Sequence, residues 1–206
     1  MAVITISKEF GTGSEKIAQK LAERLGYESI GGQLLAQVAK DLNLSESEAN
    51  TFRHVSKTSI LRYLDKYTCS IVQKVVDKEQ GCLDDKAYHE KTKELVEKIY
   101  ENDNAIILGW GAQCILKGKP NVLHVRLRKD HDKKITALVE KQKLDEKSAE
   151  RKIKTIENDS RDYVKHYFGA DWNDVRLYDL VIDMGNNSVD DAVTLICENL
   201  KHKSKQ

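Results

Sequence analysis

Residues 4–26, ITISKEFGTGSEKIAQKLAERLG, join three patterns that together decide the fold. The first residues form a short apolar run with the composition of a buried strand. Gly11 and Gly13 then make a Gly-x-Gly turn. Behind the turn, apolar side chains recur with helical spacing at Ile17, Leu21 and Leu25, ahead of Gly26, a residue suited to a helix C-cap. The stretch therefore predicts a strand, a tight glycine turn and an amphipathic helix in direct succession.

Other segments share the short apolar character of Val3–Ser7. They are rich in Val, Ile or Leu and end near a glycine or a charge, as parallel strands covered on both faces do. These segments are Ala105–Gly109, Asn121–Leu127 and Leu180–Met184, with Tyr27–Ile30 as a weaker candidate. Helical patterns lie between or after them, at 33–42, about 45–78, 86–101 and 189–200. The alternation of strands and helices predicts a three-layer α/β domain with a parallel sheet.

The composition fits one compact domain: 206 residues, of which 40% are hydrophobic and 33% are charged. A net charge of +1 provides no strong field for nucleic acid or a membrane surface, so we expect neither as a partner. A strand that begins at Val3 leaves no room for a signal peptide, and the four cysteines include no C-x-x-C pair. We therefore expect a cytoplasmic protein with reduced thiols and no metal site formed by its side chains. The sequence does not predict the oligomeric state.

The segment of about 130–174 is densely charged, helical in its periodicity and poor in apolar residues. Its composition alone favours a solvent-exposed helix pair, because charged faces are usually exposed. The alternative is a mobile lid whose basic residues meet bound phosphates when it closes. We expect a single domain with a core of about 1–129 and 175–206 and with this segment as its lid.

The Gly-x-Gly turn follows a parallel strand, and open α/β folds bind ligands at the carboxyl ends of such strands. Glycine allows a close approach of the backbone, and a helix that starts near Ser14 presents free N–H groups to an anion. Lys8 and Lys16 would add charge nearby, whereas Glu15 would repel a phosphate unless its side chain turns away. The alternative is a turn that merely requires glycine, because a lone Gly-x-Gly is a weak signal.

Four stretches, taken together and in order, point to one family. They are ITISKEFGTGSEKIAQKLAERLGY (4–27), AIILGWGAQCIL (105–116), VLHVRL (122–127) and NDSRDYVKHYFGADWNDVRLYDLVID (158–183). They resemble, respectively, the opening, the central strand and turn, the next strand, and the lid helix with the last strand of the cytidylate kinase-like family. The resemblance covers nearly the whole chain and is weakest between residues 40 and 85. It implies a P-loop kinase fold with a five-stranded parallel sheet and a helical lid.

Three features set this chain apart from true cytidylate kinases or from the usual family pattern. True cytidylate kinases carry a lysine in the phosphate loop, whereas the family, and this chain with Ser14, does not. Trp110 replaces an arginine that could bind an acceptor phosphate bidentately, whereas tryptophan offers only stacking and one N–H donor. Residues 30–32, Ile-Gly-Gly, replace a Tyr-Asp turn, so a carboxylate that might contact a ribose or base is missing. These departures leave the identity of the acceptor open.

We expect three groups of site residues. Those for the nucleotide phosphates are Lys8, Gly11, Thr12, Gly13, Ser14, Glu15, Lys16 and Lys134. Those for the acceptor are Gly32, Gln33, Gly109, Trp110 and Gln113. Catalytic contacts are expected from Lys16, Arg161 and Lys165; the last two share a helix face at i, i+4 and match the basic pair of cytidylate kinase lids. The alternative for the lid residues is an exposed charge paired with an acidic neighbour such as Glu157.

The sequence, with this resemblance, thus predicts an ATP-dependent phosphotransferase of the nucleoside monophosphate kinase type, and CMP and dCMP are the acceptors that the resemblance implies. The cofactors would be ATP and Mg²⁺, the metal being held through water and phosphate oxygens. Two alternatives stay open: a nucleotide-binding or regulatory module that has lost catalysis, and a kinase for another small-molecule acceptor.

Overall fold

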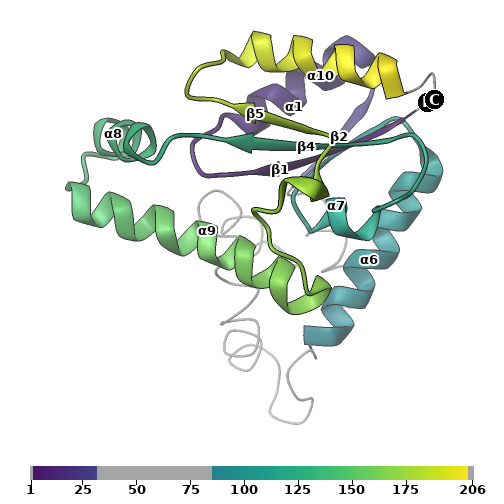
Figure 1. Ribbon diagram of the computed structural model, residues 1–206, viewed down its shortest axis with the longest axis horizontal. Coiled ribbons are helices and arrows are strands. Elements are labelled where there is room, and N and C mark those ends of the chain that lie inside the picture. The colour runs from purple at the N-terminus through teal and green to yellow at the C-terminus, as the bar shows by residue number, and fades with distance from the viewer. Residues whose placement is uncertain (1, 32–84, 204–206) are drawn as a thin grey trace, which may run out of the picture. The chain divides into compact units, whose positions relative to one another are not determined.

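A computed structural model describes residues 2–31 and 85–203 of the chain. Five strands, all parallel, form one sheet in the order β2-β3-β1-β4-β5 (Figure 1). The strands are β1 (Val3–Lys8), β2 (Glu28–Ile30), β3 (Ala105–Leu108), β4 (Val122–Arg128) and β5 (Leu180–Asp183). Each predicted strand is present within about one residue of its expected bounds, and the predicted parallel α/β fold is confirmed.

The helices of the described residues follow the expected alternation. They are α1 (Ser14–Leu25), α6 (Asp85–Asn102), α7 (Ala112–Ile115), α8 (His131–Gln142), α9 (Glu146–Phe168) and α10 (Val189–Lys203), with a 3-10 turn η1 (Val175–Leu177). The helices predicted at 86–101 and 189–200 are confirmed, and those predicted at 33–42 and about 45–78 lie outside the described residues. None of the helices within residues 2–31 and 85–203 is long and apolar enough to cross a bilayer.

The chain divides into two compact units, one of residues 1–30 and 96–206 and the other of residues 31–95. The whole sheet and the helices α1, α7, α8, α9 and α10 belong to the first unit, as do all the described site residues discussed below. A boundary between a core and a lid at about 130–174 stays a prediction.

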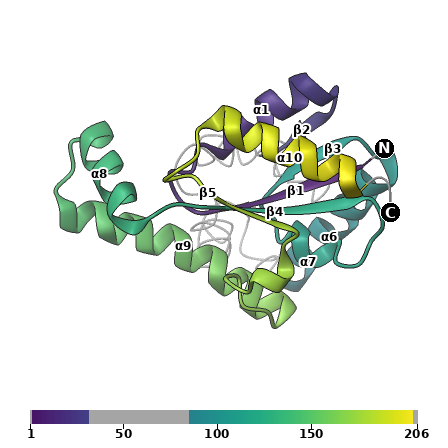
Figure 2. The same cartoon turned by 45° about the horizontal axis from the view of Figure 1, so that its top comes forward.

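The two faces of the central strands β1 and β4 differ in chemistry. On one face, apolar side chains pack against α1 and α10, which lie on that side of the sheet (Figures 1 and 2). This core includes Ile4, Ile6, Leu123, Val125 and Leu127 of the strands and Ile17, Leu21, Ile196 and Leu200 of the helices. On the other face the alternate residues are polar and yet buried, namely Thr5, Ser7, His124 and Arg126. Because successive strand residues point to opposite faces, the polar residues form a row that leads toward the carboxyl ends of the strands.

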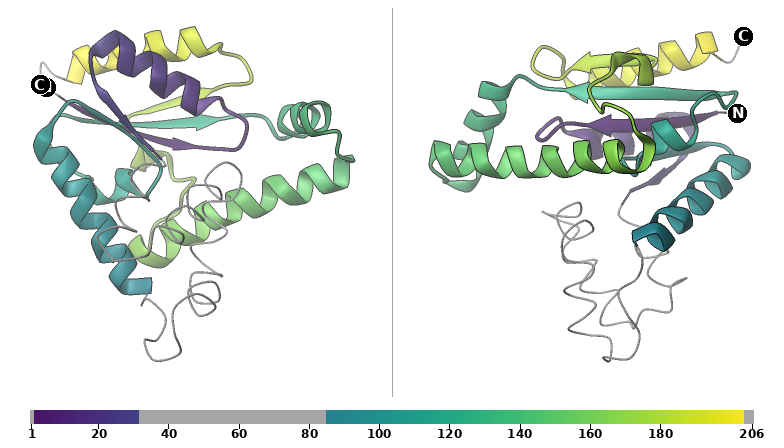
Figure 3. Two further views of the ribbon diagram at one scale, coloured as in Figure 1. Left: turned by 180° about the vertical axis from the view of Figure 1, so that it is seen from behind. Right: turned by 60° about the horizontal axis from the view of Figure 1, so that its bottom comes forward.

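The predicted charged insertion is mainly helical and contains no strand, with α8 and α9 following β4 (Figure 3). Asp130 caps the start of α8 and Asp145 the start of α9, each by accepting hydrogen bonds from the first-turn N–H groups. Leu138, Ala149 and Ile153 form a small core between the two helices, and Phe10, from the loop after β1, packs against it. This contact joins the insertion to the Gly-x-Gly loop.

Candidate phosphate-binding site

The loop between β1 and α1 has a backbone suited to an anion. Gly11 and Gly13 both have φ of +71°, a conformation that glycine adopts without steric cost. The Thr12 hydroxyl donates to the carbonyl of Glu9 at 2.9 Å and closes the loop on itself. Gly13 is the N-cap of α1 and has no side chain with which to cap it. The Lys16 N–H donates to the Gly13 carbonyl at 3.0 Å, so the N–H groups of Ser14 and Glu15 are the first-turn donors left to water or to a ligand.

The side chains of the predicted phosphate loop divide by exposure. Ser14 is buried, whereas Glu15 and Lys16 are exposed at the surface of the first turn of α1. Burial lowers the pKa of Lys8, and the nearby Glu15 carboxylate opposes that shift. Glu15 thus faces solvent and Lys8, so its charge is partly balanced by a lysine of the same loop.

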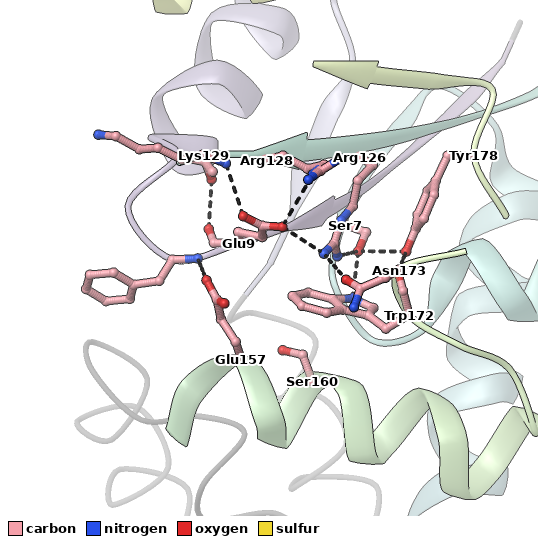
Figure 4. Close-up of polar contacts among 12 residues, drawn as sticks. Ser7, Glu9, Arg126, Arg128, Lys129, Glu157, Ser160, Trp172, Asn173 and Tyr178 are labelled. Atoms are coloured by element: carbon pink, nitrogen blue, oxygen red, sulfur yellow. Dashed lines mark hydrogen bonds and ion pairs between the residues drawn. The ribbon is translucent and has the colours of Figure 1, made fainter. Parts of the chain in front are cut away.

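Glu9 is the centre of a charged cluster at the carboxyl ends of β1 and β4 (Figure 4). Its carboxylate accepts from Lys134 Nζ at 2.8 Å, from Lys129 N at 3.1 Å and from Arg126 Nη2 at 3.3 Å. Burial alone would raise the pKa of Glu9, but the hydrogen bonds from Lys134 and Lys129 and the charge of Arg126 outweigh it, so the pKa lies below its usual value. Glu9 is therefore a fixed anion of this cluster.

Arg126 is a buried cation in the central strand β4, with 2% of its surface exposed. Its Nη1 donates to Ser7 Oγ at 3.0 Å, and its Nη2 donates to Glu9 and to Asn173 Oδ1, the latter at 3.3 Å. Burial lowers the pKa of Arg126, while Tyr178 and Glu9 oppose the shift. Because an arginine pKa starts above 12, the group stays charged and takes part as a positioning cation rather than in proton transfer.

Trp172 and Tyr178 close this cluster from the segment that follows α9. Trp172 is buried, and its Nε1 donates to Ser7 Oγ at 2.9 Å. The Tyr178 hydroxyl donates to the Trp172 carbonyl at 2.8 Å. Both aromatic residues therefore pack against the sheet and hold Arg126 in place.

Lys134, predicted to bind phosphate, lies inside the same cluster. Only 5% of its side chain is exposed, and its ammonium group bridges Glu9 at 2.8 Å and Glu157 Oε1 at 2.6 Å. The same Glu157 oxygen also accepts from the backbone N–H of Phe10 at 3.2 Å. Both helices of the insertion are thus bound to the loop, α8 through the pair of Lys134 with Glu9 and α9 through the Glu157 carboxylate on the Phe10 N–H group.

The two predicted lid residues lie further along α9. Arg161 is half-buried, donates from Nη1 to Asn158 Oδ1 at 2.6 Å, and has its Cζ 5.9 Å from the centroid of the Trp172 ring. Lys165, one turn later, is exposed. Arg161 therefore lies at the edge of the charged cluster, and the contact of either residue with phosphate stays a prediction.

The predicted acceptor residues that the structure describes lie in the turn between β3 and α7. Gly109, Trp110 and Gly111 have φ of +83°, +64° and +65° in succession. Trp110 is half-buried in a left-handed conformation that is rare for a bulky side chain and costs of order 1–3 kcal/mol. Gln113 is buried in the short helix that follows. Gly32 and Gln33, also predicted for the acceptor, lie outside the described residues.

The sequence prediction missed several members of the site. Glu9, Arg126 and Glu157 were not assigned to it, although a charged residue in the strand VLHVRL is a signal that a buried polar face is present. Lys133, next to Lys134 in α8, contacts the loop after β5: its Nζ donates to the Gly185 carbonyl at 2.8 Å and to Asn186 Oδ1 at 3.2 Å. The run of Gly and Asn in that loop reads as an ordinary turn.

Comparisons with known proteins agree with this fold. A crystal structure of an uncharacterized protein from Eubacterium ventriosum ATCC 27560 is 25% identical, with a TM-score of 0.69 and 98% of each chain covered. Shikimate kinase from Bacteroides thetaiotaomicron is 12% identical, with a TM-score of 0.53, 97% of this chain and 98% of that chain covered. A gluconokinase from Sinorhizobium meliloti 1021 is 13% identical, with a TM-score of 0.50, and the match covers 98% of this chain and 97% of that chain. The two kinases show the fold alone.

Comparison with curated protein sequences gives no match. The sequence model of the cytidylate kinase-like family matches residues 3–186, which include the loop, the charged cluster and all five strands. Because this match spans most of the chain, the chain belongs to the cytidylate kinase-like family.

Proposed function

We propose that this protein is an ATP-dependent phosphotransferase of the nucleoside monophosphate kinase type, with CMP or dCMP as the first acceptors to test. The observation that carries the proposal is the loop between β1 and α1. Two left-handed glycines and an N-cap without a side chain leave backbone donors open, and the buried cations Arg126 and Lys134 lie beside them. Phosphoryl transfer needs mainly positioning and charge stabilisation, and such a loop provides both.

The donor phosphates would lie along Gly11–Lys16, where the helix start and loop N–H groups meet the anion. Arg161 and Lys165 would approach from α9, and Lys8 and Lys16 would add charge at the loop. The acceptor would bind near Gly109–Gln113. The left-handed Trp110 supports this placement, because strained residues concentrate at binding sites and an indole offers a stacking surface to a base.

ATP would bring its Mg²⁺ with it. Within residues 2–31 and 85–203 no group of three or more His, Cys, Asp or Glu side chains is placed to hold a metal ion. Glu9, a carboxylate at the start of the loop, is already bound by three donors. The metal would therefore be held by phosphate oxygens and water, a binding mode that suits Mg²⁺ because it dehydrates reluctantly.

The direct test is the release of ADP from MgATP across a panel of acceptors. CMP, dCMP and the other nucleoside monophosphates form one arm, and small hydroxyl compounds such as shikimate and gluconate form the other. We expect ADP release that depends on one of the nucleoside monophosphates and that falls at least tenfold in Arg161→Ala and Lys165→Ala. The matched controls, Arg151→Ala and Lys154→Ala, remove exposed basic residues of the same helix and should change little.

Each alternative has its own outcome. Tight ATP binding without ADP release on any acceptor would indicate a nucleotide-binding module that has lost catalysis. Release that depends only on a hydroxyl compound would indicate a kinase for another small acceptor. Failure of ATP to bind at all would show that the proposal is wrong.

A further inference from the structure

A carboxylate of the insertion sits on the backbone of the proposed phosphate loop. Glu157, near the middle of α9, extends toward the loop (Figure 4). Its Oε1 accepts from Phe10 N at 3.2 Å and from Lys134 Nζ at 2.6 Å. Its side chain is only 13% exposed. A single anionic oxygen is therefore bound by a loop N–H group and by a buried ammonium group.

These two donors are the kind that bind a phosphoryl oxygen. A backbone N–H group and a lysine side chain both form charge-assisted hydrogen bonds with phosphate. Lys134 is also held by Glu9 at 2.8 Å, so its ammonium group would stay in place if the Glu157 carboxylate left. Departure of Glu157 would change the summed charge of Glu9, Arg126, Lys134 and Glu157 from zero to +1. The vacated position would then be an anion site.

The position of Phe10 in the loop indicates which part of a ligand would reach it. Phe10 precedes Gly11, whereas the helix begins at Ser14. A chain of phosphates that starts at the helix and follows the loop toward β1 would bring its outermost phosphoryl group to Phe10. That end of the loop is also the end that meets α8 and α9.

We propose that the Glu157 carboxylate occupies the place of the outermost phosphoryl group of a bound nucleotide or pyrophosphate, and that the ligand displaces it. The inference rests on the proposed function, since it requires that the loop binds phosphates. Displacement would free α9 from its polar contacts with Phe10 and Lys134, while the Phe10 side chain would keep its packing against the helix core. Ligand binding and the position of α9 would thereby be coupled, because both depend on the same two donors.

The alternative is that Glu157 is a permanent counter-ion whose loss would only weaken the site. The variant Glu157→Gln distinguishes a competing carboxylate from a permanent counter-ion, because glutamine keeps the size and an acceptor oxygen of glutamate but removes its charge. If the carboxylate competes with the ligand, Glu157→Gln should bind pyrophosphate and ADP roughly tenfold more tightly than the wild type, because a larger fraction of the protein is then open to the ligand. Isothermal titration calorimetry measures this, with thermal unfolding as a check on folding.

Two further variants complete the experiment. Glu150→Gln removes an exposed carboxylate from the same helix and should leave binding unchanged. Lys134→Gln, added to Glu157→Gln, should abolish the gain, because the ammonium group is one of the two donors. A Glu157→Gln protein that is folded and binds pyrophosphate as the wild type does, or more weakly, overturns the inference and leaves the phosphotransferase proposal standing. If the wild type and every variant fail to bind ADP and pyrophosphate, the proposed function fails first.

A measurement on the wild type alone covers the case in which the variants do not fold. In a protein labelled with ¹⁵N and with ¹³C at the glutamate carboxyl groups, pyrophosphate should shift both the Phe10 amide and the Glu157 carboxyl resonances along one saturation curve. Saturable binding that leaves the Glu157 resonance unmoved would overturn the inference.

Discussion

The guanidinium group of Arg126 stacks on the indole of Trp172, with its Cζ 3.4 Å from the ring centroid. The contact joins the central strand β4 to the segment that follows α9. Because the Trp172 Nε1 also donates to Ser7, which itself accepts from Arg126, the three residues form a closed arrangement. The stacking fixes the direction in which Arg126 reaches Glu9 and thereby the charged cluster beside the loop.

Two substitutions of Trp172 should distinguish the contribution of its ring to stability from that of its N–H group. Trp172→Ala should lower the free energy of unfolding by about 3–5 kcal/mol, because it removes a buried aromatic side chain and the stacking on Arg126. Trp172→Phe keeps an aromatic face and should cost only about 0.5–1.5 kcal/mol, mainly for the lost hydrogen bond to Ser7. Urea unfolding measures both. Equal costs for the two variants would show that stacking on Arg126 contributes nothing.

The apolar face of the sheet could be predicted from sequence, whereas the polar face could not. Strands buried on both faces read as continuous apolar runs, and β3 (AIIL) fits that pattern. In β1 and β4 the alternate residues Ser7 and Arg126 break it, and their partners come from distant parts of the chain. The pairing of Ser7 with Trp172 spans 165 residues, so no local spacing indicates it.

The prediction for Lys134 shows the same limit. Its place after β4 in the family pattern pointed to a basic residue near phosphate, and the structure does place it beside the loop. What the sequence could not give is its pairing with Glu9 and Glu157, which come from the loop and from the next helix. The segment 130–174 carries many acidic residues with helical spacing, and only the packing of α8 on α9 selects the one that meets Lys134.

Gly111 should be intolerant of a side chain for a packing reason. A Cβ atom there would lie 2.6 Å from a ring carbon of Phe168 and 3.0 Å from one of Tyr163. Gly111→Ala would therefore displace the half-buried rings of Phe168 and Tyr163 in addition to straining a backbone with φ of +65°. The matched control is Gly118→Ala, with φ of +76° and nothing within 4 Å of its Cβ position.

Thermal and urea unfolding of the two glycine variants give the comparison. Gly118→Ala should lower the free energy of unfolding by only about 1–2 kcal/mol, the cost of placing alanine in a left-handed conformation. Gly111→Ala should cost at least about 1 kcal/mol more, in the range of overpacked cores. Equal destabilisation would indicate that the aromatic residues of α9 do not pack against the turn after β3.

His124 should make stability depend on pH. Its Nδ1 lies 2.8 Å from the Thr5 hydroxyl in a buried pair, and burial lowers the pKa of His124 while Asp179 opposes the shift. The unfolded chain, with a pKa of about 6.5, therefore binds the proton more readily than the folded protein. The contribution of His124 to stability is fully present above pH 6.5 and is lost as the pH falls through the lower, folded-state value.

Urea unfolding between pH 5 and pH 7.5 tests this dependence. His124→Asn retains a polar group near Thr5 but cannot titrate, so its stability should vary less with pH over this range than that of the wild type. The dependence of stability on pH should differ most between the two proteins below about pH 6.5, which is the pKa of histidine in the unfolded chain. Parallel curves would show that His124 is not the group responsible.

Restoring a lysine at residue 14 is the sharpest test of the phosphate loop. Ser14 is the first residue of α1, directly after the left-handed Gly13, and it is only 5% exposed. A lysine there would have to direct its ammonium group over the loop. Ser14→Lys should tighten ATP binding by about tenfold, equivalent to about 1.4 kcal/mol, the size expected for one charge-assisted hydrogen bond to phosphate. Without ATP the variant should be less stable than the wild type, because the new charge then lacks a partner.

The control for added charge is Gln19→Lys, at an exposed position of the same helix. It raises the net charge by the same amount but lies more than one helical turn from the loop, so it should change ATP affinity by less than about twofold, as a screened surface charge does. Calorimetric titration with ATP, with and without Mg²⁺, separates the two effects. An equal gain in both variants would mean that only net charge matters. A folded Ser14→Lys protein with no gain would mean that residues 9–14 do not form a phosphate loop, and the donor site would then have to be sought elsewhere in the chain.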